Sequence, residues 1–576
     1  MKKFLIFSTI LLALAACNDD FLDRQPLDQV TAQTFFNTES DLNTYVNSLY
    51  SYLNTRDVFT GDNQSDNVET KAYNTVVAGQ QKVETAAATA GWTWTDLRKA
   101  NFFLENYGKA QIPAEGKNHF AGIARLFRAW FYSDRVKRFG DVPWYSTSLQ
   151  IDNPDLYKAR DPRILVMDSV LNDLNFAVQH IRTTGPVGTF NRWSANALKA
   201  RICLHEGTFR KYHGLGNEQK FLQAARDAAK AVIDSKAYAL YSTGNTTTDY
   251  RDLFASEEAK VTEVMLPRVY DFSLRVTHTA NGTFITPTLG GPGLTKSLIN
   301  SYLMVDGSPF TSKAGSDTAT FYYETQNRDP RLAQTIRTPG YTRLGQTQKL
   351  VPDFDNARTG YQVIKFVSTP AQDGYNTNTN DLPLIRYAEV LLVYAEARAE
   401  LGELTQADLD MSINLIRKRV GMPAMTLATL SIDPVQERLY PNVTGPLKAA
   451  ILEIRRERRV ELALEGFRYD DLMRWKRGPL LAETFRGMYF PGKGEFDLDH
   501  NGQTDIAIVD QIPATRKPNI QYLKLGDVFV LSEGTKGNAV AFPNLNKVFD
   551  ETKHYYFPLP KTELVLNNKL VQNPGW

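Results

Sequence analysis

Apolar side chains recur at helical spacing over long stretches of the chain, and this pattern restricts the fold more than any other feature. Within residues 118–144, one apolar stripe consists of Phe120, Ile123, Phe127, Phe131 and Val136. Residues three or four positions apart lie on the same face of an α-helix, so this segment is expected to form one long amphipathic helix. Gly140 and Pro143 mark its end.

Further helices follow the same pattern and are arranged as successive pairs. The expected pairs are 92–110 with 118–144, 163–181 with 194–212, and 385–402 with 405–421; a fourth opens at 446–466, and 220–234 is an additional helix. Gly402 and Gly421 fall at helix ends. Repeated antiparallel pairs indicate tetratricopeptide-like packing, although no clean repeat of about 34 residues is present.

Long segments rich in Gly, Asn, Thr and Pro separate the helical units. They cover residues 57–91, 271–294, 337–362 and 485–552. Loops of this length inside a compact domain are usually functional. We therefore expect a mainly α protein in which tetratricopeptide-like helix pairs form a scaffold with long irregular loops.

The N-terminus has the pattern of an export signal that ends at a cysteine. Lys2 and Lys3 precede an apolar run over residues 4–16, which is shorter than the roughly 20 residues a membrane-spanning helix needs. Cys17 follows directly and is one of only two cysteines. Residues 14–17, LAAC, resemble a bacterial lipobox, which predicts cleavage after residue 16 and acylation of Cys17. An ordinary signal peptide with a chance cysteine is the alternative.

Charge and composition exclude several classes of function. The chain has 66 basic and 64 acidic residues, a net charge of +2, which argues against a nucleic-acid partner. No second apolar run approaches membrane-spanning length, so the membrane is expected to be contacted through the N-terminal lipid only. Cys203 is then left without a disulfide partner.

The segment EIRRERRVELALEGFRYDDLMRW changes from apolar to charged along one predicted helix face. Ile451, Ile454, Arg458, Glu461 and Glu465 follow one another at helical spacing. The two glutamates are candidates for a glycosidase carboxylate pair. Alternatively they belong to a buried ion network with Arg458 and Arg468. Because nearby arginines lower a carboxyl pKa, whereas a general acid needs a raised one, we favour the structural interpretation.

Motifs along the whole chain resemble those of the SusD/RagB family of nutrient-binding lipoproteins of Bacteroidota. They include CNDDFLDRQP at residue 17, FRA and FGDVP at 127–143, RDPRL at 328–332, RYAEVLLVYAEA, RRERRVELALEGFRYDDLMRW and the terminal FPLPKTELVLNNKLVQNPGW. The chain departs from the family pattern at Ile123 and Arg98, which are both scaffold positions.

The resemblance implies an architecture and a role. The fold would be SusD-like, built on four tetratricopeptide-like units, with residues 17–576 as a single domain whose halves span about 21–240 and 260–576. The protein would capture oligosaccharides and deliver them to a SusC-like TonB-dependent transporter. Residues 18–20, Asn-Asp-Asp, are similar to the acidic signal of lipoproteins in the outer membrane that face the cell exterior.

A glycan site requires exposed aromatic rings beside polar side chains, because sugars present both apolar faces and hydroxyls. The family's site is built from loops, which here points to Asp66, Asn67, Tyr73 and Trp92. Tyr270 and Phe272, in the loop after residue 269, are further candidates. Trp94 falls on the family's structural tryptophan and is assigned to the core. Trp92 is therefore predicted to be the exposed platform.

An enzyme and a peptide importer are the alternative functions. The sequence has no HExxH, GxSxG, Walker A or CxxC motif, and its seven histidines have no metal-ligand spacing. No catalytic residue is therefore assigned, although a glycoside hydrolase needs no such motif. Helix-pair repeats often bind peptides, so a peptide-importing lid of RagB type is the other alternative.

The segment FDLDHNGQTD matches part of a calcium-binding loop. Asp497, Asp499, Asn501, Gly502 and Asp505 occupy positions one, three, five, six and nine. The twelfth position is an isoleucine instead of a bidentate glutamate, so a complete EF-hand is excluded. Structural calcium at Asp497, Asp499, Asn501 and Asp505 is the only cofactor considered, and a polar turn without metal is the alternative.

Overall fold

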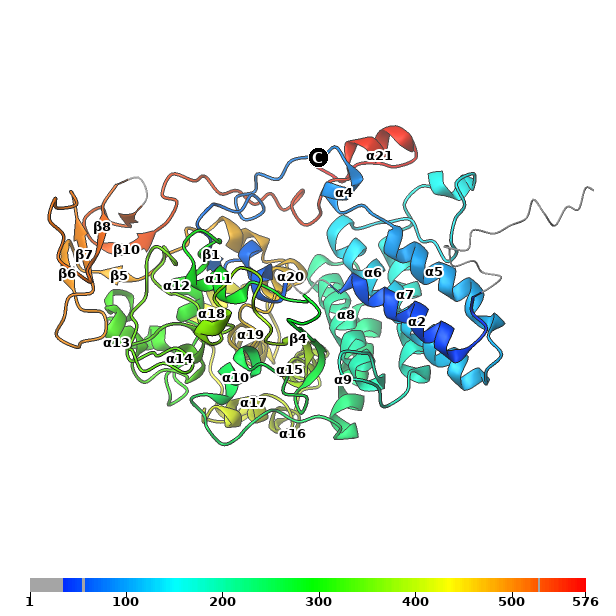
Figure 1. The fold of residues 1–576 in the computed structure, drawn as a ribbon, viewed down its shortest axis with the longest axis horizontal. Helices are drawn as coiled ribbons and strands as arrows, with labels where there is room; N and C mark the ends of the chain where they lie inside the picture. Colours follow the sequence, from blue (N-terminus) through cyan, green and yellow to red (C-terminus); the bar gives the residue numbers. More distant parts are fainter. Residues whose placement is uncertain (1–34, 54–56, 527–528) are drawn as a thin grey trace, which may run out of the picture.

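The computed structural model describes residues 35–53, 57–526 and 529–576. The molecule is elongated, with the N-terminal helices at one end and the C-terminal half at the other (Figure 1). The C-terminal segment returns to the N-terminal helices, where the amide of Lys561 donates to the carbonyl of Glu84 at 3.0 Å. The start of α21 (Lys561–Leu566) is therefore tied by backbone hydrogen bonding to the segment before α4 (Ala87–Ala90).

The N-terminal half is a layer of packed helices. These are α2 (Glu39–Leu49), α4 (Ala87–Ala90), α5 (Thr95–Asn106), α6 (Ala114–Phe139), α7 (Arg163–His180), α8 (Arg192–His213) and α9 (Glu218–Ser235). Each neighbour in the series α5 to α9 packs against the next, which confirms the first two expected pairs. Asn191 caps α8 through its side-chain oxygen, and Gly140 ends α6 with φ of 75°.

The C-terminal half contains a second set of helices around α15 (Tyr387–Glu400). The others are α16 (Gln406–Asp410), α17 (Ile413–Arg419), α18 (Pro434–Leu439), α19 (Lys448–Glu461) and α20 (Arg468–Arg474). Nearly every residue of α15 is buried, because α15 packs against α8, α9 and α19. This helix joins the two halves. Gly402 and Gly421 adopt positive φ just beyond helix ends, as expected.

Short elements occupy the segments between the helices. The helices are α3 (Asp57–Thr60), α10 (Asp249–Ala255), α11 (Ala280–Ile285), α12 (Lys296–Ile299), α13 (Phe321–Thr325), α14 (Arg331–Thr335) and α21 (Lys561–Leu566). Single 3₁₀ turns also occur between helices, for example η3 (Gly61–Gln64) after α3 and η5 (Pro154–Tyr157) before α7. The strands are β1 (Val68–Glu69), β2 (Val264–Arg268), β3 (Gly293–Leu294) and β4 (Leu382–Arg386). β1 pairs antiparallel with β3, and β2 with β4.

Segment 485–552, expected to be an irregular loop, instead contains two three-stranded sheets. Its strands are β5 (Tyr489–Phe490), β6 (Gly494–Phe496), β7 (Ile506–Val509), β8 (Gln521–Lys524), β9 (Val530–Leu531) and β10 (Gly537–Val540). The orders are β5-β10-β9 and β6-β7-β8, with β7 and β8 parallel. Strands of two to four residues are too short to show a clear alternating pattern, which explains the wrong expectation.

The two glutamates of the charged helix face belong to a buried ion network. Glu461 lies 2.6 Å from both Arg386 and Arg419, and 2.9 Å from Arg331. Burial would raise the pKa of Glu461, but these three guanidinium groups outweigh it and lower that pKa far below its usual range. The structural interpretation is confirmed, since all three cations hold the carboxylate ionised.

The predicted partners of these glutamates were wrong. Glu465 lies beyond the end of α19 and pairs with Lys365 and Arg386, each at 2.7 Å. Arg458 pairs instead with Asp471 at 2.8 Å. Helical spacing limited the prediction to neighbours in sequence, whereas the actual partners come from α14, β4, α17 and, for Lys365, the segment between α14 and β4.

Among residues 35–53, 57–526 and 529–576, no helix combines the length and apolar character needed to cross a bilayer. Cys203 is buried in the N-terminal core as a free thiol, and burial raises its pKa to about 12. Cys17, the expected lipidation site, lies outside the described residues.

Candidate functional site

A cavity of about 590 Å³ opens in the C-terminal half between β2, α11 and the segment before β4. Its walls are Phe59, Arg268, Tyr270, Arg275, Val276, Thr277, His278, Thr279, Thr283, Leu289, Tyr375 and Asn376. The residues come from three separate stretches of sequence, at 59, 268–289 and 375–376, and none of these stretches contains a long helix. The long loops expected to carry function therefore supply most of this cavity.

One wall is a tight hairpin that exposes apolar side chains. Asp271 and Val276 exchange backbone hydrogen bonds of 2.9 and 3.1 Å, and the Asp271 carboxylate accepts from the amide of Ser273 at 2.7 Å. The hairpin tip places Phe272 66% exposed and Leu274 71% exposed. Folding has thus placed two large apolar side chains in water, where a binding partner could cover them.

The opposite wall is the segment that leads into β4. His278 and Asn378 exchange backbone hydrogen bonds of 3.0 and 3.1 Å, which fix this segment beside the hairpin. Tyr375 stands at its tip with 74% of its surface exposed. Asn376 follows with φ of 54°, and Arg275 on the hairpin has φ of 55°. Both lining residues adopt the left-handed conformation that favours glycine.

His278 forms the floor as a neutral ring. Its Nδ1 accepts from the amide of Ala280 at 3.2 Å, so its Nε2 carries the proton and donates to the carbonyl of Asn380 at 2.9 Å. Burial lowers the pKa of His278 to about 4. The Tyr270 ring packs edge-on against it at 4.5 Å between centroids. The imidazole therefore supports Tyr270 and adds no positive charge at neutral pH.

The structure places two of the sequence-predicted residues at this site. Tyr270 lines the cavity, and Phe272 lies on the adjacent hairpin tip. Tyr73 is exposed but packs edge-to-face against Phe542, at 6.2 Å between centroids, away from the cavity. The aromatic candidates from the 270 loop are thus brought together, whereas the candidate from the 57–91 segment is not.

Asp66 and Asn67 are structural residues, so their assignment to the ligand site was wrong. Asp66 is buried and lies 2.7 Å from Arg468 and 3.0 Å from Arg459. Asn67 is also buried; its side-chain oxygen accepts from Arg459 at 2.8 Å, and its amide donates to Asp62 at 3.0 Å. Their hydrogen bonds are made within the protein, and their side chains are not available to a ligand.

The expected platform at Trp92 was also wrong. Trp92 is 3% exposed, and its ring packs edge-on against Trp94 and Phe139, with centroids 5.2 and 4.9 Å apart. Trp94 is the more accessible ring of the two. Both border a second cavity of about 460 Å³ beside α5 and α21. The polar loop before Trp92 suggested exposure, but its ring packs against Trp94 and against Phe139 at the end of α6.

Of the residues that line the first cavity, sequence reasoning named only Tyr270, and the largest side chains it missed include Tyr375, Arg268 and Arg275. Tyr375 lies in QDGYNTNTN, a polar segment in which a lone aromatic residue was a usable signal. Arg268 and Arg275 carried no such signal, because their position depends on how β2 and the hairpin fold.

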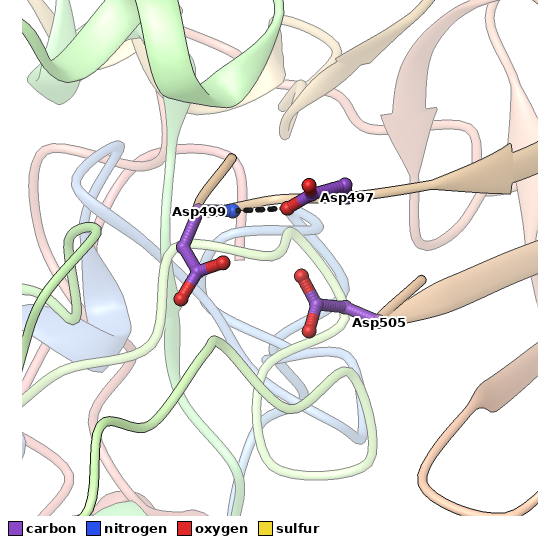
Figure 2. Close-up of side chains that lie close together, drawn as sticks. All are labelled: Asp497, Asp499 and Asp505. Atoms are coloured by element: carbon purple, nitrogen blue, oxygen red, sulfur yellow. Dashed lines mark hydrogen bonds between the residues drawn. The ribbon is translucent and has the colours of Figure 1, made fainter. Parts of the chain in front are cut away.

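The expected calcium loop connects β6 to β7. Carboxylate oxygens of Asp497, Asp499 and Asp505 lie within 4.8 Å of one another, and Figure 2 shows Asp499 and Asp505 directed toward the same space. Asp497 also accepts from the amide of Gly502 at 2.7 Å. Asn501 is exposed on the same turn. Three carboxylates in this arrangement are suitable oxygen ligands for calcium, and calcium binding stays a prediction.

Residues 239–576 match the model of the SusD family, and residues 20–204 match one described as starch-binding associating with outer membrane. The chain belongs to the SusD family. The family resemblance inferred from the sequence motifs is therefore confirmed.

Relatives within the SusD family extend over most of the chain. SusD-like protein P2 of Formosa agariphila is 23% identical over 508 residues, covering 83% of this chain and 92% of that protein. A SusD-like protein of Bacteroides ovatus is 24% identical over 504 residues, with 83% of each covered. The similarity includes both halves.

Solved structures share the fold. A SusD-like protein from Bacteroides fragilis has a TM-score of 0.70 at 22% identity, covering 96% of this chain and 100% of that chain. A SusD-like carbohydrate binding protein from the same species has a TM-score of 0.68 at 21% identity, covering 93% and 100%. The expected SusD-like, mainly α fold is confirmed.

Proposed function

We propose that this protein binds glycans at the cell surface and passes them to a SusC-like TonB-dependent transporter. The observation that carries the proposal is the cavity bordered by Tyr270, Tyr375 and Phe272. Their aromatic surfaces lie beside Arg, Asn and Thr side chains. Sugar rings need this combination, because their CH faces pack on aromatic rings while their hydroxyls form hydrogen bonds.

The family comparison supports a carbohydrate ligand for this site. One structural neighbour is titled a carbohydrate binding protein, and one matching family model is described as starch-binding. The same description includes association with the outer membrane, in agreement with a lipid on Cys17 as the anchor. In this proposal the lipid-anchored protein faces the exterior, and the transporter is its partner.

The protein acts by binding and not by hydrolysis. The glutamate pair that could have served a glycosidase is engaged by arginines and Lys365. A general acid requires a raised pKa, whereas that of Glu461 is lowered. Ligand delivery to a transporter requires only reversible capture, which the open aromatic cavity provides.

Affinity electrophoresis in polysaccharide gels tests the proposal. Tyr375→Ala should lose affinity by about thirtyfold, since a ring contact of about 80 Å² contributes about 2 kcal/mol. Tyr73→Ala, an exposed tyrosine outside the cavity, is the matched control and should bind as the wild type does. An equal loss of polysaccharide affinity in both variants would contradict the proposal. So would a wild-type protein that binds peptides from a mixture but binds no polysaccharide.

A further inference from the structure

The cavity carries positive charge. Among its described lining residues, the formally charged side chains are Arg268, at the end of β2, and Arg275, on the hairpin. The remaining titratable ring, His278, is neutral because burial lowers its pKa to about 4. No carboxylate lines the described walls, so a ligand in this cavity meets two guanidinium groups with no opposing charge.

The acidic residues of the same segments are bound elsewhere. Asp271 accepts from the amide and hydroxyl of Ser273 within the hairpin turn. Asp373 pairs with Arg343 at 2.6 Å. Asp381 accepts from the amides of Tyr270 and Ala259, at 2.9 and 3.1 Å. The carboxylates that could have neutralised the cavity thus stabilise its loops.

Arg268 and Arg275 themselves make no ion pair and no side-chain hydrogen bond with any residue in the described part of the chain. By contrast, Arg386 in the same half contacts three carboxylates, those of Glu263, Glu461 and Glu465. Arginine presents planar pairs of N–H donors that match the oxygens of a carboxylate or a similar oxyanion. Two such groups beside aromatic rings form a binding surface for an acidic sugar.

We infer that the ligand is an acidic glycan, one that carries uronate carboxylates or sulfate esters. This inference rests on the proposed glycan-binding function and specifies its substrate class. The acidic group of one residue would accept hydrogen bonds from Arg268 and Arg275, while neighbouring rings pack on Tyr270 and Tyr375. Carboxylate and sulfate present the same kind of oxygen acceptor, so the experiment includes both.

Binding should be measured with matched polysaccharides that differ only in charge. The acidic probes are polygalacturonate, alginate, chondroitin sulfate and carrageenan; the matched probes are their carboxyl-reduced or desulfated derivatives, and starch, xylan and mannan are added as neutral glycans. We expect at least one acidic probe to bind and its neutral derivative to bind about tenfold or more weakly. Affinity for the acidic probe should also fall as salt is raised, because exposed charges are screened.

Variants assign this effect to the two arginines. Arg268→Gln and Arg275→Gln should each weaken binding of the acidic probe about tenfold. For the neutral derivative, the affinities of these variants should lie closer to that of the wild type. Arg516→Gln, which removes an exposed arginine in the β7–β8 connection, is the control and should leave binding unchanged. Melting temperatures of all three variants should match the wild type.

The outcomes separate this inference from the proposed function. Neutral glycans could bind as tightly as acidic ones, with affinity reduced in Tyr375→Ala but not in the arginine variants. In that case the glycan function stands and the acidic preference is overturned. If no probe of either set binds, both are overturned. An equal loss of affinity for the acidic probe in Arg516→Gln would also overturn the inference. The effect would then come from the net charge of the protein and not from the cavity.

Discussion

Asp66 and Arg468, 402 residues apart in the sequence, form a buried two-point ion pair with contacts of 2.7 and 2.8 Å. The same carboxylate lies 3.0 Å from Arg459 on α19. The first long loop is therefore anchored directly to α19 and α20. Because this loop also contributes Phe59 to the cavity, the ion pair helps to fix one wall of the candidate site.

Asp66→Ala should lower the free energy of unfolding by about 3–5 kcal/mol, since it leaves two buried arginines without their partner. Asp317→Ala, at an exposed aspartate, is the control and should change stability by less than about 0.5 kcal/mol. Urea denaturation measures both. Equal stability of the two variants would contradict a structural role for Asp66.

The same ion pair predicts acid sensitivity. Burial would raise the pKa of Asp66, but Arg459 and Arg468 outweigh it and lower the pKa to about 2. A lowered pKa means that the pair stabilises the fold above about pH 4, the unfolded value, and that this contribution is lost as pH falls toward 2. The stability gap between wild type and Asp66→Ala should therefore narrow between pH 4 and 2, as measured by denaturation at each pH.

Trp92→Ala should destabilise the fold and leave the residues of the candidate cavity unchanged. Removing a buried aromatic ring costs about 3–5 kcal/mol through lost packing. Tyr375→Ala should show the reverse, with near-native melting and weakened binding, because its ring is mostly exposed. Calorimetry and affinity electrophoresis on both variants test the assignment; a stable Trp92→Ala protein that fails to bind glycan would contradict it.

Glu461→Gln should lower the free energy of unfolding by about 3–5 kcal/mol. The substitution removes the negative charge that Arg331, Arg386 and Arg419 share as a partner. Glu483→Gln, at an exposed glutamate, serves as control. Neither wild type nor variant should release reducing sugar from polysaccharides. Release by wild type that disappears in a folded Glu461→Gln protein would show that the network has a catalytic role.

Calcium should raise the melting temperature if the β6–β7 turn binds it. Asp499→Asn should abolish the increase, whereas Asp152→Asn, at an exposed aspartate outside the turn, should retain it. Burial and the charges of Asp499 and Asp497 raise the pKa of Asp505, so the calcium effect should weaken as pH falls and that carboxylate protonates. Identical melting with calcium and with chelator would exclude the metal.

Cys17→Ala should move the protein from the membrane fraction to the soluble fraction, since stable anchoring needs the acyl chains of a lipoprotein. Fractionation followed by a carbonate wash measures this. A variant that stayed fully in the washed membranes would show that another contact holds the protein there.

The sequence predicted the positions of the long helices closely, but it predicted only part of the candidate site. The stripe from Phe120 to Val136 predicted α6, because helical spacing alone determines which side chains share a face. Tyr270 and Phe272, chosen from a polar loop, lie in and beside the candidate cavity, and their role in ligand binding stays a prediction. Trp92 was predicted to be exposed but is buried, because a ring's exposure depends on which distant residues pack on it; here Phe139 at the end of α6 does so.

The sequence by itself determined the helical scaffold, the family and the charged character of the α19 face, since each depends on local spacing or ordered motifs. Only the tertiary structure decided how the charges pair: Arg468 contacts Asp66, and Glu461 contacts Arg331, Arg386 and Arg419. It also decided that Arg268 and Arg275 face one cavity. Ion pairs and binding surfaces form between segments that are close in space, and separation along the chain carries no information about that closeness.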